Sequence, residues 1–473
     1  MSFDVLVVGG GTAGCILAAR LSESPSRSVC LLEAGPDYGP LAEGRWPAEL
    51  LDANAVVSSH LWEPGADDGR TLGGKVLGGS SAVNACMVVQ GTPADYDEWG
   101  PAWSYQSIRP YLERARAMLR ARPAITDRPS PFHLAFVAAA EEVGYPRPDD
   151  MDDPGEPVSA GPYPANVVEG VRWSAALAYL DACRMRANLT LRPDTTVDRL
   201  VLRGERAVGV VDASGRFHGA ETVVLTAGAY FSPAILLRSG IGPKTQLERL
   251  GIDVVSDLSV GERLLDHCGA TVAWAPSEAL REDTDRRTLE GEPVTSHALL
   301  KAASSKCASE AWDLHLVTWL GATDEPGRYE ANVMVFHMKP SSHGSVTLRS
   351  RDPSDPPRVE RGFLSDEADL APLLEGIELA RSLAATDPLR DLLDYELRPG
   401  ALTPEEYVRS TVRGYFHPAG TCPIGDVVDG RGRIHGLDGL VVADASIMPT
   451  LPRANTNLTT AAVAERLAES LTI

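Results

Sequence analysis

The stretch FDVLVV at residues 3–8 runs directly into GGGTAG at residues 9–14. A short apolar run ended by glycine is typical of a buried parallel strand, and the spacing GxGxxG after it is that of a dinucleotide-binding turn. The first glycine makes the tight turn, the second admits a pyrophosphate, and the third lets the next helix pack on the strand. The positive end of that helix, expected over residues 12–21, attracts the diphosphate. We therefore expect dinucleotide contacts from Gly9, Gly11, Thr12, Ala13 and Gly14.

An acidic residue stands where such a turn needs one. Residues 29–33 are a second apolar strand, which completes a strand–helix–strand unit. Glu33 ends it 24 positions after Gly9 (33 − 9). A carboxylate there accepts hydrogen bonds from both ribose hydroxyls and repels a 2′-phosphate, so NADP is disfavoured. Glu33 and Ala34 are expected at the ribose; the alternative is a structural glycine turn, and the motif does not choose FAD over NAD.

Composition excludes several classes of protein. The 473 residues carry 44 Lys and Arg against 65 Asp and Glu, a net charge of −21, which argues against binding nucleic acid or anionic lipid by charge. The seven Cys form no CxxC pair, which favours reduced thiols in a cytoplasm over disulfides or a metal site. We expect no membrane span, since no apolar run approaches ~18 residues, and see no signal-peptide pattern.

Four further segments resemble signatures of one family. They are GKVLGGSSAVN at 74–84, GAYFSPAILLRSGIG at 228–242, HPAGTC at 417–422 and VADAS at 442–446. Together with the glycine turn they are similar, in order and over nearly the whole chain, to the glucose–methanol–choline (GMC) oxidoreductases. The resemblance implies FAD, a Rossmann-like FAD lobe, an antiparallel sheet lobe over the flavin, and oxidation of an alcohol by hydride transfer.

The order of predicted elements fits that implication. Nucleotide-type elements open the chain, recur in the middle and return at the end, and a β-rich block from about 266 to 417 interrupts them. We predict an α/β fold: a doubly wound Rossmann-like FAD-binding domain with an inserted antiparallel-sheet (α+β) substrate domain. The FAD-binding domain is expected at 1–91, 185–265 and 418–473, and the substrate-binding or cap domain at 92–184 and 266–417.

The resemblance also implies where the flavin lies. The glycines and serines of residues 78–81 leave backbone amides uncovered, although a plain Gly-Ser loop is the alternative. Ala82 takes the position at which some relatives carry a His bonded to the flavin, so non-covalent FAD is expected. Residues 232–242 are interpreted as mainly structural. The expected FAD contacts beyond the first turn are Gly78, Gly79, Ser81, Asn84, Ala85, Met87, Val197, Ala227, Gly228, Asp444, Ala445 and Thr456.

The chemistry is expected from two residues. The resemblance makes His417 the base that takes the hydroxyl proton of the substrate, a task that suits an imidazole because its pKa lies near neutrality. Asn455, 38 positions later (455 − 417), matches the second catalytic position and can donate to the alkoxide. A helix N-cap is the alternative for Asn455, and a buried strand-end carboxylate is the alternative for Asp444.

Three other histidines are weaker candidates. The pair Asp266-His267 is interpreted as structural. In the alternating run 312–319, His315 shares a face with Val317 and Trp319, but the sequence does not say which face covers the flavin. His315 and His337 are therefore only weak candidates for substrate contact.

The predicted function is FAD-dependent oxidation of a small-molecule alcohol to a carbonyl by hydride transfer to flavin N5, with O₂ or another carrier reoxidising the flavin. Three alternatives stay open: a dehydrogenase that uses a quinone or other redox carrier, a cyanohydrin lyase with redox-silent FAD, and a FAD-stabilised interaction protein without turnover. The sequence does not name the alcohol or the acceptor.

Overall fold

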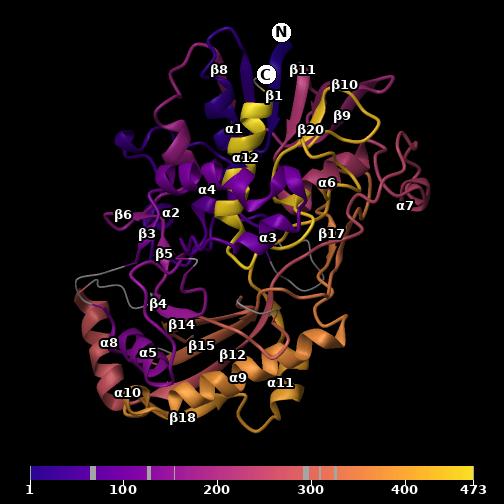
Figure 1. The fold of residues 1–473 in the computed structure, drawn as a ribbon. Coiled ribbons are helices and arrows are strands. Elements are labelled where there is room, and N and C mark those ends of the chain that lie inside the picture. The colour runs from indigo at the N-terminus through magenta and orange to yellow at the C-terminus, as the bar shows by residue number, and fades with distance from the viewer. Residues whose placement is uncertain are drawn as a thin grey trace.

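The structure is a computed structural model that describes residues 2–63, 71–124, 129–153, 155–290, 298–307, 311–323 and 328–471. It has two lobes, each built on a seven-stranded sheet. The first lobe holds both chain ends and fills the upper half of Figure 1, and the second lobe lies below it. This arrangement confirms the predicted fold class, a parallel nucleotide-type sheet beside an antiparallel one.

The first sheet is mixed, and its central strands are parallel. Its order is β8-β2-β1-β11, and beyond β11 lie the parallel strand β20 and the antiparallel hairpin β10-β9. The bounds are β1 (Ser2–Val8), β2 (Val29–Leu32), β8 (Leu189–Arg192), β9 (Val197–Arg203), β10 (Arg206–Asp212), β11 (Phe217–Leu225) and β20 (Leu440–Val442).

The register of this sheet brings the predicted motifs together. Val8 pairs with Leu32 on one side and with Leu225 on the other, and Leu225 pairs with Val442. These four strands therefore end at one edge, where doubly wound sheets bind their ligands. The segments that leave this edge are the glycine turn, Glu33-Ala34, Ala227-Gly228 and Asp444-Ala445.

Helices pack on the first sheet and on one another and help to bury its apolar strands. α1 packs against α12, α12 packs against α4, and α6 packs against β9. Ile108 and Leu112 of α4 belong to the core of this lobe, although the predicted division assigned 92–184 to the second lobe. The structure thus divides that range between the two cores, and the exact domain boundaries stay a prediction. The bounds are α1 (Thr12–Leu21), α4 (Tyr105–Met118), α6 (Gly228–Arg238), α7 (Lys244–Arg249) and α12 (Thr456–Ser470).

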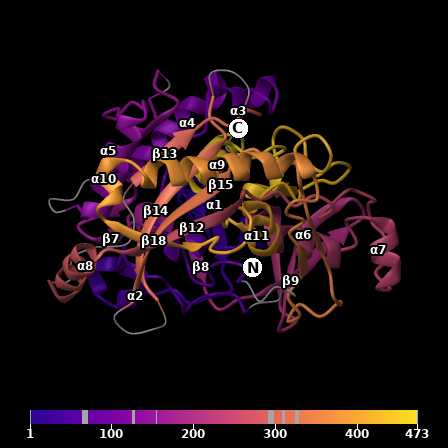
Figure 2. The ribbon, with the colours of Figure 1, turned by 90° about the horizontal axis from the view of Figure 1, so that it is seen from below.

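The second sheet is antiparallel throughout. Its order is β18-β12-β15-β14-β13-β4, with β19 beside β12. Helix α9 lies across strands β12, β14 and β15, as Figure 2 shows from below. The bounds are β4 (Ser159–Pro162), β12 (Cys268–Pro276), β13 (Ala298–Ala302), β14 (Leu314–Ala322), β15 (Tyr329–His337), β18 (Leu393–Arg398), β19 (Arg413–Gly414), α5 (Pro131–Glu142), α8 (Glu278–Glu290), α9 (Leu370–Ala384), α10 (Asp387–Arg390) and α11 (Pro404–Thr411).

Strand alternation gives this sheet two different faces. Leu314, Leu316 and Val335 point into the core under α9, with Ile377 of that helix. Their neighbours along the strands point the opposite way, toward the first lobe, because successive side chains alternate. The sheet thus forms a roof over the edge at which the parallel strands end.

Short elements connect these parts. They are η1 (Leu41–Glu43), α2 (Ala48–Leu51), η2 (Gly79–Ala82), α3 (Pro93–Asp97), η3 (Pro101–Trp103), β3 (Arg122–Pro123), β5 (Pro164–Ala165), β6 (Val167–Val168), β7 (Val171–Arg172), η4 (Ala176–Leu180), β16 (Ser345–Thr347), β17 (Arg358–Glu360), η5 (Glu367–Asp369) and η6 (Ala445–Ile447). In the described part of the chain no helix combines the length and hydropathy that a bilayer crossing needs.

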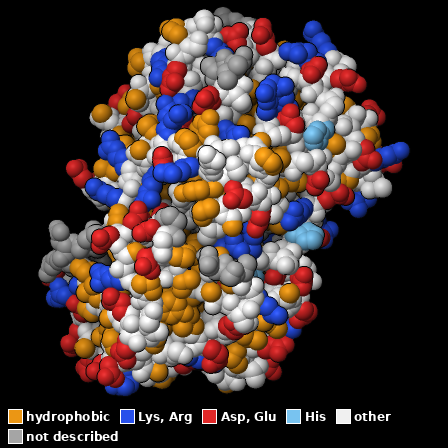
Figure 3. Space-filling view, viewed as in Figure 1, with side chains coloured by type: hydrophobic (Ala, Val, Ile, Leu, Met, Phe, Trp, Pro, Cys, Tyr) orange, Lys and Arg blue, Asp and Glu red, His pale blue; other side chains and the backbone are white. Residues whose placement is uncertain are grey.

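Charged side chains of both signs are interspersed over the face drawn in Figure 3. The seven cysteines are unpaired, and six of them are buried. Within the described ranges, no group of three or more His, Cys, Asp or Glu side chains is placed to hold a metal ion.

Candidate active site

A long cavity of about 1490 Å³ runs between the two lobes. One end is walled by the glycine turn and Glu33, and the other by His417 and Asn455. Most residues predicted from the sequence to bind the cofactor line it: Gly9, Gly11, Thr12, Ala13, Glu33, Ala34, Gly79, Asn84, Ala85, Met87, Val197, Ala227, Gly228, Asp444, Ala445 and Thr456.

Gly14, Gly78 and Ser81 lie behind the cavity wall instead. A Cβ on Gly14 would lie 1.8 Å from the carbonyl oxygen of Gly9, so this glycine lets α1 pack against the turn. The Gly78 amide donates to the Gly10 carbonyl at 2.7 Å and joins the two glycine loops. The Ser81 hydroxyl donates to the Gly78 carbonyl at 2.6 Å and accepts from the Ala175 amide at 3.0 Å. These three residues support the wall, and their contact with a cofactor stays a prediction.

Glu33 is held in place by backbone amides. Its Oε2 accepts from the Gly10 amide at 2.7 Å, and its Oε1 accepts from the Gly35 amide at 2.8 Å. Burial raises the pKa of Glu33 to about 7, because the surrounding protein disfavours the charged form. Hydroxyl donors from a ligand would favour the ionised form, since a carboxylate only accepts hydrogen bonds.

The two glycine loops form a cradle that fits a dinucleotide. A Cβ on Gly79 would lie 2.6 Å from the Cα of Gly11, so the loops touch without side chains between them. The first amides of α1 have no partner within the helix, and the first two residues of that helix, Thr12 and Ala13, line the cavity. A helix N-terminus of this kind attracts phosphate groups. Because the same cavity continues along residues 83–87 to His417, the site suits a ligand with a ring system beyond its diphosphate.

The loop at residues 79–87 offers no histidine to the cavity. Ala82 is buried and does not line it; the neighbouring Val83 does. Cys86 also faces the cavity, but burial raises the pKa of its thiol to about 11, which keeps it protonated. A protonated thiol is a weak nucleophile.

Asp444 holds two loops together at the cavity edge. Its Oδ2 accepts from the Gly228 amide at 2.8 Å and from the Ser232 hydroxyl at 2.6 Å, and its Oδ1 accepts from the Ser446 amide at 2.8 Å. The carboxylate thus has structural partners, while the residue also lines the cavity beside Ala445.

His417 and Asn455 meet at the other end. The amide Nδ2 of Asn455 lies 3.1 Å from Nε2 of His417, and both residues are buried. Asn455 precedes α12 as its N-cap residue, but its side chain makes no capping hydrogen bond. The structure therefore favours a contact with His417 over the capping role that was the alternative. Burial lowers the pKa of His417 to about 3, so the imidazole is neutral near pH 7.

Asp266 and His267 contact His417 directly, which the sequence did not indicate. The His417 amide donates to Asp266 Oδ1 at 2.8 Å. The Nδ1 atoms of His267 and His417 lie 2.8 Å apart, and the His267 ring is fully buried. Burial, with the neighbouring His417 as a further cause, holds the pKa of His267 well below 6.5. The pairing across 150 residues depends on tertiary packing and leaves no local sequence pattern.

The roof of the cavity near His417 is aromatic and apolar. The ring of Tyr415 stacks on that of Phe336, with centroids 3.7 Å apart and planes at 3°, and its centroid lies 4.4 Å from that of His417. Met87 and Met334 line the same region. Strand alternation could have indicated Met334 and Phe336 as a pair, but not which face they share with the cavity.

The far part of the roof is polar. Arg398 forms an ion pair with Glu330 and donates to Asn332 at 3.0 Å. All three line the cavity, with Thr271 and Arg413, whose guanidinium donates to the Thr271 hydroxyl at 2.6 Å.

His315 and His337 do not line the cavity. Val317 and Trp319 do, so the face that they share with His315 is the one turned toward the cavity, which the sequence left open. His315 itself stacks on Trp312 with ring centroids 4.6 Å apart. The Nε2 of His337 lies 3.6 Å from a carboxylate oxygen of Asp369. The His315 ring also meets the edge of the Tyr415 ring, with centroids 6.1 Å apart, and therefore lies behind a residue of the cavity wall.

Comparisons with known proteins agree with this architecture. A family model described as GMC oxidoreductase matches residues 3–269, and a second model of the same description matches residues 340–464. The chain belongs to the GMC oxidoreductase family. FAD is the cofactor expected of this family, and the glycine cradle fits it.

Individual relatives cover nearly the full chain. An oxygen-dependent choline dehydrogenase from Photobacterium profundum is 31% identical over 528 residues, covering 99% of this chain and 93% of the relative. A 5-(hydroxymethyl)furfural oxidase from Methylovorus sp. is 36% identical over 540 residues, covering 99% and 98%. The crystal structure of pyridoxine 4-oxidase from Mesorbium loti superposes with a TM-score of 0.85 at 27% identity, covering 100% of this chain and 99% of that one.

Proposed function

We propose that this chain oxidises an alcohol to a carbonyl compound, with His417 as the general base and Asn455 as its partner. The observation that carries the proposal is the 3.1 Å contact between Asn455 Nδ2 and His417 Nε2 in the wall of a cavity that begins at the glycine turn. A neutral imidazole accepts the hydroxyl proton at Nε2. The Asn455 amide donates to the oxygen as negative charge develops there.

The cofactor in this proposal is non-covalent FAD. Bound FAD supplies the acceptor for the hydride that leaves the alcohol carbon. Glu33 and the first amides of α1 hold the ribose and diphosphate, and residues 83–87 lie along the rest of the cavity. Val83 and a protonated Cys86 offer no reactive nucleophile in that loop, which supports a non-covalent flavin.

The substrate that we propose is an uncharged alcohol carried on a flat ring. The Tyr415–Phe336 stack with Met87 and Met334 gives an apolar wall beside His417, and such walls bind ring systems by dispersion and burial. The carboxylate of Glu330 is already paired with Arg398, which makes it a poor partner for a cationic substrate. The furfural oxidase and pyridoxine oxidase that this chain resembles carry names of ring alcohols.

Anaerobic mixing tests the proposal. The holoprotein would be mixed with aryl, furfuryl, aliphatic and quaternary-ammonium alcohols, and flavin absorbance followed. We expect bleaching, fastest with the ring alcohols. Air-driven return with peroxide would identify O₂ as the acceptor, whereas return only with a quinone would identify the dehydrogenase. Absence of bleaching with every alcohol contradicts the proposal, and cyanohydrin cleavage without bleaching identifies the lyase.

The location that we propose is the cytoplasm. Its support is that the seven cysteines are unpaired and that six are buried. Fractionation of the source cells, with the chain detected by antibody, tests it; recovery outside the cytoplasm contradicts it.

A further inference from the structure

His417 has a different neighbour at each ring nitrogen. Its Nε2 faces Asn455, and its Nδ1 lies 2.8 Å from Nδ1 of His267. The second nitrogen of His267, Nε2, lies 3.1 Å from the backbone carbonyl oxygen of Pro452. The four groups form one hydrogen-bonded chain that ends on a carbonyl.

That carbonyl determines where the protons lie. A carbonyl oxygen only accepts, so His267 must carry its proton on Nε2. A neutral His267 then has a bare Nδ1, and the 2.8 Å contact requires a proton on Nδ1 of His417. A neutral His417 in turn has a bare Nε2, the nitrogen beside Asn455. The opposite arrangement would place the lone pair of His267 Nε2 against the lone pairs of the Pro452 oxygen.

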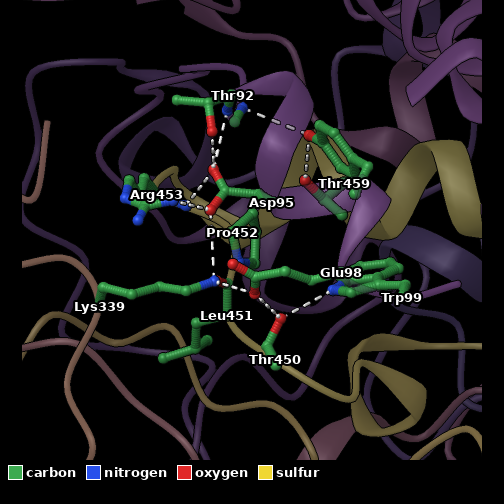
Figure 4. Close-up of polar contacts among 12 residues, drawn as sticks. Thr92, Asp95, Glu98, Trp99, Lys339, Thr450, Leu451, Pro452, Arg453 and Thr459 are labelled. Atoms are coloured by element: carbon green, nitrogen blue, oxygen red, sulfur yellow. Dashed lines mark hydrogen bonds and ion pairs between the residues drawn. The ribbon is translucent and has the colours of Figure 1, made fainter. Parts of the chain in front are cut away.

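The Pro452 carbonyl is itself fixed by a buried ionic cluster, drawn in Figure 4. The backbone amide of Arg453 donates to Asp95 Oδ2 at 3.0 Å, and its guanidinium donates to Asp95 Oδ1 at 2.6 Å. Lys339 donates to the Leu451 carbonyl at 2.9 Å. The residues on both sides of Pro452 are therefore tied to the protein.

Asp95 is suited to hold this position. Its side chain is fully buried at the start of α3, where its Oδ2 accepts from the amide and the hydroxyl of Thr92 at 2.8 and 2.9 Å. A carboxylate that accepts at both oxygens has little freedom to rotate. His417 is thus supported by His267, by the Pro452 segment and by the start of α3.

We propose that His267 is a positioning residue that fixes His417 in the tautomer able to act as a base, and that the Asp95–Arg453 pair holds the Pro452 carbonyl that orients His267. This inference rests on the proposed role of His417. Once His417 Nε2 takes the hydroxyl proton, the ring carries a proton on each nitrogen, and His267 Nδ1 continues to accept from His417 Nδ1. The same contact therefore also stabilises the charged form.

Two substitutions of His267 separate this role from packing. Glutamine offers an amide oxygen to His417 Nδ1 and an N–H to the Pro452 carbonyl, whereas leucine fills space and offers neither. In His267→Leu we expect flavin reduction at saturating alcohol to slow about 10- to 100-fold, by analogy with the loss of an orienting hydrogen bond behind a metal-ligating histidine. In His267→Gln we expect a rate within about fivefold of the original, with FAD content and substrate Kd unchanged in both.

A substitution and a matched control test the role of the Asp95–Arg453 pair. Asp95→Asn keeps the shape and one acceptor but loses the charge, and we expect a smaller slowing, about 3- to 10-fold, at unchanged FAD content. Arg381→Met breaks a similar carboxylate–guanidinium pair, with Glu396 at 2.8 Å, on the outer helix α9. That control should leave the reduction rate unchanged.

A measurement on the unsubstituted holoprotein avoids any folding defect of a variant. Nitrogen-15 NMR of labelled histidines, assigned with His267→Gln and His417→Ala, reports which ring nitrogen carries hydrogen. We expect a protonated Nδ1 for His417 and a protonated Nε2 for His267. The opposite pair of tautomers overturns the inference.

The kinetic outcomes are equally decisive. A wild-type reduction rate in His267→Leu, or equal slowing in the leucine and glutamine variants, overturns the positioning role. Neither result affects the proposed function, provided that His417→Ala is slow. A fast His417→Ala variant instead removes the proposed function, and the NMR result would then describe a structural histidine pair.

Discussion

At the scale of single residues, the pair at the end of the cavity can be tested directly. His417→Ala should slow flavin reduction about 10²- to 10⁴-fold, because a general base contributes that much. Asn455→Ala should slow flavin reduction about 10²-fold if its amide stabilises the developing alkoxide. Stopped-flow absorbance normalised to bound FAD measures both, and the double variant should lose less than the product of the single losses.

The control for that experiment is His435→Ala, because His435 lies at the surface, where its Nε2 donates to the Gly425 carbonyl. Its flavin reduction should match the original chain. Lost FAD with a normal rate in the remaining holoprotein would give His417 and Asn455 structural roles only.

The protonation state of His417 predicts an unusual pH profile. Burial lowers its pKa to about 3, so the base is neutral and competent at every pH well above that value. The limiting rate of flavin reduction should therefore be level from about pH 5 to pH 9 and fall only as the pH approaches 3. An inflection near 6.5, the ordinary value for histidine, would contradict this prediction.

Glu33 predicts a pH dependence of cofactor binding in a higher range. Burial raises its pKa to about 7, and ribose hydroxyls need the ionised form as acceptor. FAD affinity of the apoprotein should thus rise with pH up to about 7 and then level off. Glu33→Ala should weaken FAD binding about 10- to 150-fold, the loss of one charge-assisted bond of about 1.5–3 kcal/mol. Titration of apoprotein with FAD at several pH values measures both effects.

Glu33→Gln serves as the control, because glutamine has the same shape and does not titrate. Its FAD affinity should not vary with pH across this range. An equal pH dependence in the glutamine variant would show that another group is responsible.

At the scale of elements, Arg172 ties the loop at residues 79–87 to its neighbours. It is 1% exposed, and its guanidinium donates to the carbonyls of Ala82 and of four residues around α2: Glu49, Leu50, Asp52 and Ala55. Arg172→Met would leave buried acceptors unpaired, at about 1–3 kcal/mol for each that water cannot reach. We expect a loss of at least about 3 kcal/mol in unfolding free energy, together with weaker FAD retention.

Chemical denaturation of the apoprotein measures that loss. Arg109→Met, which breaks an exposed pair with Glu113 on α4, should leave the denaturation midpoint unchanged. Normal stability and FAD binding in Arg172→Met would contradict the anchoring role.

The same scale shows what the sequence could predict. The strand–turn–helix at residues 3–21 follows from local periodicity and spacing, and the structure has it there. The second strand was predicted to end at Glu33 and ends one residue earlier, at Leu32. The division of residues 92–184 between two cores did not follow, because α4 packs on α12 at the far end of the chain. Two further features depend on tertiary packing in the same way. They are the contact of His267 with His417 and the orientation of Val317 toward the cavity.

At the scale of the whole molecule, the cavity joins the lobes, so its ligand should stabilise both. FAD contacts are expected from the first lobe, whereas His417 and Phe336 come from the segment that forms the second sheet and its return. A ligand that binds only the folded state raises stability by RT ln(1 + [L]/Kd), about 2.7 kcal/mol at 100 Kd. The midpoint temperature of thermal unfolding should therefore rise with added FAD, and both lobes should unfold in a single transition. Two transitions, only one of them sensitive to FAD, would contradict this prediction.

The pairing of β11 with β20 has a consequence for how the chain reaches this state. Val223 pairs with Leu440, 217 positions later (440 − 223), and Ser2 pairs with Gly219. Strand β20 therefore cannot pair with β11 until the ribosome has made the second lobe. Contacts so distant in sequence slow folding, because a long loop must be ordered before they form. A nascent chain of this protein spends much of its synthesis with the edge of β11 exposed, a period in which chaperones have an unpaired strand to shield.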